Sequence, residues 1–136
     1  MRDNLFIRNC FLELYRQHFA DVPLPNKIVI GFGRYSRTRL GSIKLNAQKQ
    51  SVIVLTGYFR SEEVPLAVLQ ATLAHEFVHY LHGFNSLHPR KISHPHRGNV
   101  VKDEMRRRGL LPILIEQQRW LRTQWREFVR GTAQQG

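Results

Sequence analysis

Cysteine is almost absent from this chain of 136 residues, which contains Cys10 alone. A single thiol excludes an internal disulfide and a zinc ribbon built from cysteines, and it suits a reducing, cytoplasmic location. Long apolar runs are also missing, because charged residues interrupt the N-terminal segment. We therefore expect no signal peptide, no membrane span and no membrane partner.

Acidic residues are scarce, since 10 Asp and Glu stand against 21 Lys and Arg, for a net charge of +11. Such an excess attracts polyanions such as nucleic acid, although a charged run is also the ordinary surface of a solvated helix. Arginines between residues 119 and 130 recur at helical spacing and predict one basic stripe. In the same segment, Trp120 is a candidate for stacking on a base, and Trp125 is predicted to face the core. The candidate nucleic-acid-binding residues are Arg106, Arg107, Arg108, Arg119, Arg122 and Arg126.

Hydrophobic residues make up 42% of the chain, which is typical of one globular domain spanning 1–136. Their spacing predicts an amphipathic N-terminal helix, then a small sheet, then a buried helix that ends before Gly83. Three strands are expected, with a fourth left open and Ser51–Thr56 central. The last helix is expected to start near Pro112 and to continue through Phe128. The predicted ranges are helix 4–20, sheet 27–56, helix 64–82, loop 84–98 and C-terminal helices 99–130. Strands bracketed by helices without βαβ alternation indicate an α+β fold.

Histidine is concentrated in one segment, because six of the seven lie between residues 75 and 96. Residues 75–79 read His75-Glu76-Phe77-Val78-His79, which is the HExxH pattern. On a helix the two histidines share one face about 6 Å apart along the axis, so they can bind one Zn²⁺. Glu76, about 100° further round, is placed to act as a general base on a water molecule. We expect His75 and His79 to be metal ligands and Glu76 to be catalytic.

A catalytic zinc needs a third protein ligand and one open position. The metzincin spacing is absent, because it would need a histidine at position 85. His96 is the favoured third ligand, since it directly precedes a predicted helix, and His94 is the alternative metal ligand. His88 and Glu104 also remain open. His82 falls on the metal face of the same helix and is expected to assist the carbonyl groups at the helix end, with a supporting role beside the metal as the other option.

These motifs resemble the SprT-like zinc metallopeptidases over roughly residues 25–110. The helix VPLAVLQATLAHEFVHYLHG carries the likeness, together with the preceding strands RLGSIKLN and SVIVL. His96 and Gly98, with Met105 beyond, correspond to the family's third-ligand segment, although Arg97 separates the histidine from the glycine and valines replace the usual aromatic residue. The resemblance implies a minimal zincin-like domain with Zn²⁺ and His96 as third ligand. It also implies cleavage of protein substrates, with DNA-bound proteins among those of some members.

The sequence therefore predicts a zinc metallopeptidase that hydrolyses peptide bonds by zinc-activated water, with Glu76 as the general base. Tyr80 points off the metal face and is a poor candidate for stabilising the oxyanion. Two alternatives stay open. The first is a non-catalytic nucleic-acid-binding module with a structural zinc site of histidines, and the second is a hydrolase that uses the same site on another substrate. The oligomeric state is not predicted.

Overall fold

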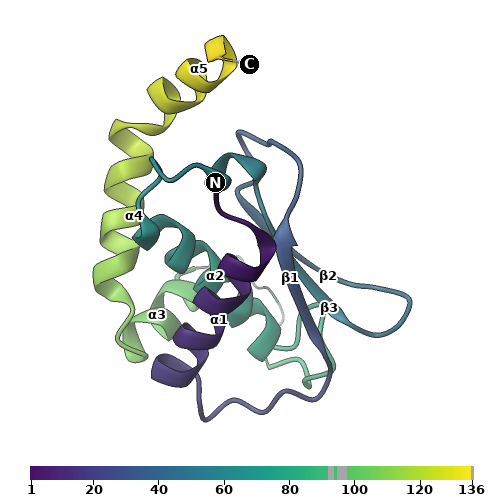
Figure 1. Cartoon of the computed structure of the whole chain (residues 1–136). Helices are drawn as coiled ribbons and strands as arrows, with labels where there is room; N and C mark the ends of the chain where they lie inside the picture. Colours follow the sequence, from purple (N-terminus) through teal and green to yellow (C-terminus); the bar gives the residue numbers. More distant parts are fainter. Residues whose placement is uncertain (92–93, 95–97, 136) are drawn as a thin grey trace.

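A computed structural model describes residues 1–91, 94 and 98–135 (Figure 1). The elements in the described part are α1 (Asn4–His18), β1 (Ile28–Phe32), β2 (Gly41–Leu45), β3 (Ser51–Leu55), the 3₁₀ turn η1 (Gly57–Arg60), α2 (Leu66–Leu81), α3 (Val100–Arg107), α4 (Leu111–Thr123) and α5 (Trp125–Gln135). The predicted α+β class is confirmed. No helix in this part of the chain is both long and apolar enough to cross a membrane.

The described sheet has three strands in the order β1-β3-β2, so β3 is central as predicted. β1 pairs with β3 in parallel, and β2 pairs with β3 antiparallel. Ile53 of β3 is fully buried, because the central strand is covered by its neighbours and by the helices. β2 is consequently an edge strand within the described residues, with one side of its backbone unpaired by β3.

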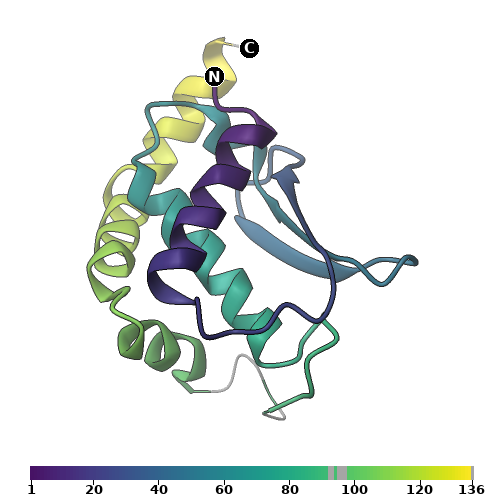
Figure 2. The same cartoon turned by 60° about the horizontal axis from the view of Figure 1, so that its bottom comes forward.

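The helices α1 and α2 pack on one face of the sheet, and the other face carries no described helix (Figures 1 and 2). Phe77 of α2 packs against α1, because Phe11 and Phe19 meet its ring edge-on with centroids 5.1 and 4.8 Å away. Phe77 is one of the two middle residues of the HExxH pattern, and Val78 beside it is also fully buried. Burial of these two side chains orients α2 about its axis, so both histidines are held on another side of the helix.

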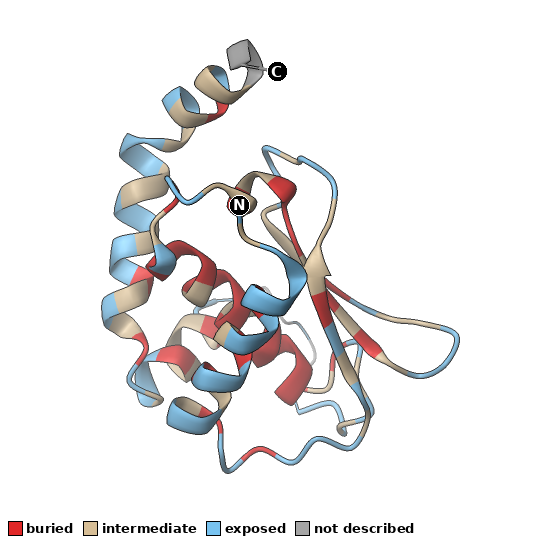
Figure 3. Cartoon of the chain, in the orientation of Figure 1, coloured by how far each residue is buried: buried red, intermediate tan, exposed pale blue. Residues whose placement is uncertain are grey.

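Nearly the whole of α2 is buried (Figure 3). The helix ends where predicted, because Gly83 adopts φ +90°, a conformation that side chains rarely tolerate. The Gly83 N–H donates to the Tyr80 carbonyl, and the Phe84 N–H donates to the His79 carbonyl, which is the Schellman arrangement. This turn fixes the last turn of α2, including His79.

The C-terminal segment differs from the single long helix expected after Pro112. The helix is interrupted at Gln124, where φ is −124°, and this break separates α4 from α5. Trp120 and Trp125 lie on either side of the break, with ring centroids 5.9 Å apart, and both pack near Phe128. Clustering of these large rings explains the break, because a straight helix would hold the two Trp side chains on different faces.

Candidate active site

His75 and His79 point their rings to the same place beside α2. Their Nε2 atoms are 3.2 Å apart, and the ring planes are nearly perpendicular, at 81°. Two nitrogen ligands of a tetrahedral zinc, each about 2.0–2.1 Å from the metal, are separated by about 3.3 Å. The histidine pair therefore fits a zinc ion, and the same distance also suits a hydrogen bond between the rings.

Glu76 belongs to α2, and its side chain points to Gly41, the first residue of β2. Only 8% of the surface of Glu76 is exposed. A methyl group added at Gly41 would be 3.1 Å from Glu76 Oε2 and 2.8 Å from Thr72 Cγ2. The absence of a side chain at Gly41 therefore leaves the space in which the carboxyl group sits. Burial raises the pKa of Glu76 from 4.5 to about 7, and the positive charge of Arg39 opposes this rise. A carboxyl group with this pKa can take up and release a proton near neutral pH.

A groove runs between β2 and α2 and passes over these residues. It consists of two adjoining hollows of about 400 and 530 Å³, which share Arg39, Gly41, His75 and Glu76. The first hollow continues past His79 to the turn after α2, and the second continues to α4. The acid and the histidines therefore open onto a continuous surface long enough to accept more than one residue of a ligand.

The backbone of β2 is presented to this groove. The Leu40 carbonyl accepts a hydrogen bond from the Thr56 N–H, and the Asn46 N–H donates to the Gln50 carbonyl. With the register of β2 on β3, these two bonds show that the even-numbered residues between 40 and 46 direct their backbone groups toward β3. In an antiparallel ladder the intervening residues direct their N–H and C=O groups to the opposite edge. Residues 41, 43 and 45 therefore offer their backbone groups to a further strand.

The residues predicted as third metal ligand lie after α2 in the chain. His96 lies outside the described residues, and His94 is exposed. Within the described residues, no group of three His, Cys, Asp or Glu side chains could hold a metal ion. The described part thus brings together two of the predicted ligands, His75 and His79.

His88 contacts the segment between α1 and β1. Its Nε2 is 2.7 Å from the Pro23 carbonyl, and its ring meets Tyr80 edge-on at 5.0 Å. The hydroxyl of Tyr80 donates to the Asn26 carbonyl, so this side chain points away from the site, as expected. These contacts favour a structural role for His88.

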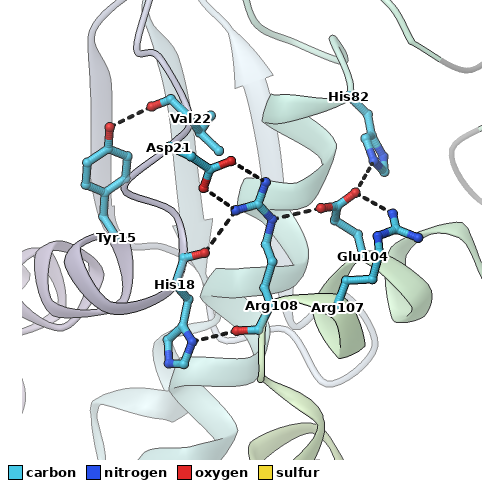
Figure 4. A network of polar contacts seen from close by, with 8 residues as sticks. All are labelled: Tyr15, His18, Asp21, Val22, His82, Glu104, Arg107 and Arg108. Carbon is cyan, nitrogen blue, oxygen red and sulfur yellow. Dashed lines mark hydrogen bonds and ion pairs between the residues drawn. The ribbon is translucent and has the colours of Figure 1, made fainter.

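Glu104 is bound by cations at both carboxylate oxygens (Figure 4). Arg107 donates to Oε1 at 2.7 Å, and Arg108 donates to Oε2 at 2.8 Å. Burial acts to raise the pKa of this carboxyl, but the hydrogen bonds from Arg107 and Arg108 outweigh it and lower the pKa. His82 Nε2 lies 3.4 Å from Oε1, so the side chain of His82 faces α3 rather than the carbonyls at the end of α2, contrary to the favoured prediction. Glu104 connects α2 to α3, which argues against its use as a metal ligand.

The predicted basic residues fall into two groups. Arg106, Arg107 and Arg108 each form an ion pair, and Arg108 also reaches Asp21 at 2.7 Å and is only 15% exposed in its side chain. Arg108 thus joins the ends of α1 and α3 (Figure 4). The remaining candidates are exposed, and the break at Gln124 distributes them over two helices: Arg119 and Arg122 on α4, and Arg126 on α5.

Two residues of the groove were not singled out from the sequence. Gly41 makes the space for Glu76, and the available signal was an isolated glycine inside a β-strand pattern, which often marks a close approach. Arg39 sits in a polar turn of the sequence, where nothing marks it as different from the neighbouring arginines. The tertiary structure alone brings it to both hollows of the groove.

The burial of Glu76 is expected to make the free energy of unfolding depend on pH. In the metal-free protein, the folded state retains the Glu76 proton up to about pH 7, whereas the unfolded chain loses it near pH 4.5. The free energy of unfolding should therefore fall by about 3 kcal/mol across this interval and change no further above it through this group. Urea unfolding with a chelator at about pH 4 and pH 8 measures this change. Glu76→Gln should remove that part of the pH dependence, and an identical slope in both proteins contradicts the buried acid.

No known protein family, curated protein or solved structure matches the chain.

Proposed function

We propose that this protein is a zinc-dependent metallopeptidase. The observation that carries the proposal is the pair of Nε2 atoms at 3.2 Å, with the buried carboxyl group of Glu76 beside them in an open groove. No family model matches the chain, and the same activity is what the motifs of residues 25–110 imply by their resemblance to SprT-like metallopeptidases. A structural zinc site of histidines needs no acid and no groove at its side, so the non-catalytic alternative is less well supported.

His75 and His79 would hold the ion, and His96 is proposed as the third ligand. When bound, Zn²⁺ supplies Lewis-acid activation of water and of the scissile carbonyl. Glu76 Oε2 takes the proton of the attacking water and later gives it to the nitrogen of the leaving amine. In the metal-free protein burial raises the pKa of this carboxyl group, which makes it a stronger base toward a proton than an exposed glutamate.

A peptide is the substrate that the groove accommodates best. An extended peptide can pair with the free edge of β2 through the backbone groups of residues 41, 43 and 45. Such backbone pairing does not depend on the side chains of the peptide. It would hold a scissile peptide bond next to Gly41. Glu76 lies directly under that position, since Gly41 is the residue against which its carboxyl group packs.

The direct test is the metal content of the purified protein, followed by its cleavage of an unfolded protein such as casein. We expect one zinc ion per chain and cleavage that a chelator stops and added zinc restores. Protein that binds no zinc overturns the proposal. Protein that holds zinc without cleaving casein or short peptides supports the structural-site alternative.

Gly41→Ala is expected to disturb the site without removing any of its chemical groups. The new methyl group would displace either Glu76 or Thr72, and Thr72 is held by a 2.8 Å hydrogen bond from Gln117. We expect a loss of about 1–3 kcal/mol in the free energy of unfolding and a loss of cleavage of up to about 100-fold. Gly131→Ala is the control, because nothing lies within 4 Å of a methyl group there. Equal behaviour of the two variants would show that Gly41 leaves no essential space.

We also propose that the exposed arginines of α4 and α5 recruit DNA, on which protein substrates would be bound. Contacts of this kind are made to phosphates, so the affinity for duplex or single-stranded DNA should fall steeply between low and physiological salt. Fluorescence anisotropy across a salt series measures this. A triple exchange of Arg119, Arg122 and Arg126 to Gln should flatten the salt dependence, and absence of binding at low salt eliminates the idea.

A further inference from the structure

The charged side chains on β2 and on the segment just before it are basic. Arg39 and Lys44 line the groove, and a third hollow of about 880 Å³ continues from them around the outer face of the sheet, where Arg34 is added. Its floor includes the half-buried Val52 and Val54 of the central strand. Glu76 is the single acid among the described residues that line these three hollows.

Among the described residues, the three cations Arg34, Arg39 and Lys44 have no acidic partner within ion-pair distance, unlike the arginines at the end of α3. The acids elsewhere in the described chain lie on α1 and the segments next to it, on the segment before α2, and on α3 to α5. The positive field at the groove is therefore opposed there by one acid alone of the described part, Glu76 near Arg39, and no ion pair within that part weakens the charges of Arg34 and Lys44.

The pairing geometry of β2 determines which side chains of a bound peptide would lie near Arg34, Arg39 and Lys44. A strand added at the free edge has side chains that alternate between the two faces of the sheet. Side chains next to Ser42 and Lys44 project to the outer face, and those between them project toward Glu76. The outer-facing positions of the ligand thus lie beside Lys44 and the third hollow, within the field of Arg34 and Arg39.

We propose that this groove selects acidic peptides, namely extended segments that carry Asp or Glu at alternate positions. The inference rests on the proposed peptidase function and specifies its substrate class. The backbone edge of β2 supplies a general affinity for extended chains, and the three cations add the preference for negative side chains. The apolar floor at Val52 and Val54 accommodates the methylene groups of these side chains.

The test uses two fluorescent peptides of the same length, one with Glu at alternate positions and one with Gln in their place. Binding is measured by anisotropy to the zinc-loaded Glu76→Gln variant, which is expected to bind without cleaving. Cleavage of both peptides is measured with the unaltered protein. We expect the acidic peptide to bind and to be cleaved in preference, and each of Arg39→Gln and Lys44→Gln to reduce that preference about fivefold. Arg8→Gln on α1 removes one positive charge outside the groove and should leave the preference unchanged.

The outcomes separate the two proposals. Equal binding and equal cleavage of both peptides overturn the acidic preference and leave the peptidase function standing. Preferential binding of the acidic peptide, with neither peptide cleaved, supports the charge preference and counts against the peptidase. Displacement of the acidic peptide by a short single-stranded oligonucleotide at much lower concentration, with loss of that effect in Arg39→Gln, would assign the cations to nucleic acid and overturn the inference.

Discussion

Replacing Glu76 with Gln is expected to lower peptide cleavage by at least about 10²–10⁴-fold while zinc is still bound. Glutamine has the shape of glutamate and fits the same space against Gly41, but its amide cannot accept a proton from water. The two histidine rings do not depend on the Glu76 side chain for their position, because the buried residues Phe77 and Val78 orient α2. Loss of proton transfer is thus separated from loss of metal.

The measurement is a single-turnover rate on a labelled peptide, together with zinc content by elemental analysis. Glu116→Gln is a matched control, since it removes one exposed acid on α4 that lies outside the groove. Loss of zinc together with activity would mean that Glu76 supports the metal site. Unchanged cleavage in Glu76→Gln refutes the role of this residue as general base.

Replacing His79 with Ala is expected to reduce zinc affinity more than the roughly 10–100-fold that removal of a supporting group costs, and to abolish cleavage with it. His79 is 5% exposed, and its Nε2 faces that of His75, so no other described side chain can take over this position. His75→Ala should have the same effect. Zinc titration with a colorimetric chelator measures the affinity, and circular dichroism shows whether each variant is folded.

The same titration identifies the third ligand. We expect His96→Ala to lose tight binding and His94→Ala to keep it. His88→Ala is the control, because the His88 ring is hydrogen-bonded to the Pro23 carbonyl. Removing this ring should leave the zinc affinity unchanged. Full stoichiometric binding by His96→Ala would exclude that residue and favour His94.

The elements that the sequence predicts best are those specified by residues close together in the chain. The apolar spacing along α2 and the glycine after it give correct bounds to within two residues, since Gly83 meets a purely local demand for positive φ. The strands are also short and locally distinct, and Ser51–Leu55 is recognisable as central from its β-branched residues. The break at Gln124 was not predictable, because it accompanies packing of Trp120 against Trp125 across the turn.

For the site, the HExxH spacing predicts the relation of His75 to His79, because positions four apart on a helix are neighbours. The HExxH spacing contains no information about which residue packs against the carboxyl group of Glu76. That residue is Gly41, which lies 35 residues earlier and is brought there by the packing of α2 on β2. The raised pKa of Glu76 follows from this packing, since burial requires atoms from both elements.

The roles of the arginines also depend partly on the sequence and partly on the tertiary structure. A count of arginines predicts a basic surface but treats Arg108 and Arg119 alike. In the folded chain, Arg108 is partly buried and paired with Asp21 and Glu104, whereas Arg119 is exposed. The reason is that ion pairs between distant segments form only when the ends of α1 and α3 meet.

The proposed chemistry therefore depends on five consecutive residues, because helix geometry converts their spacing directly into two imidazoles and an acid at one place. Folding adds the environment of that chemistry: the depth at which Glu76 is buried, the free edge of β2, and the cations that flank it. These properties depend on distances between segments far apart in sequence. Such distances result from the packing of the whole core and from no local pattern.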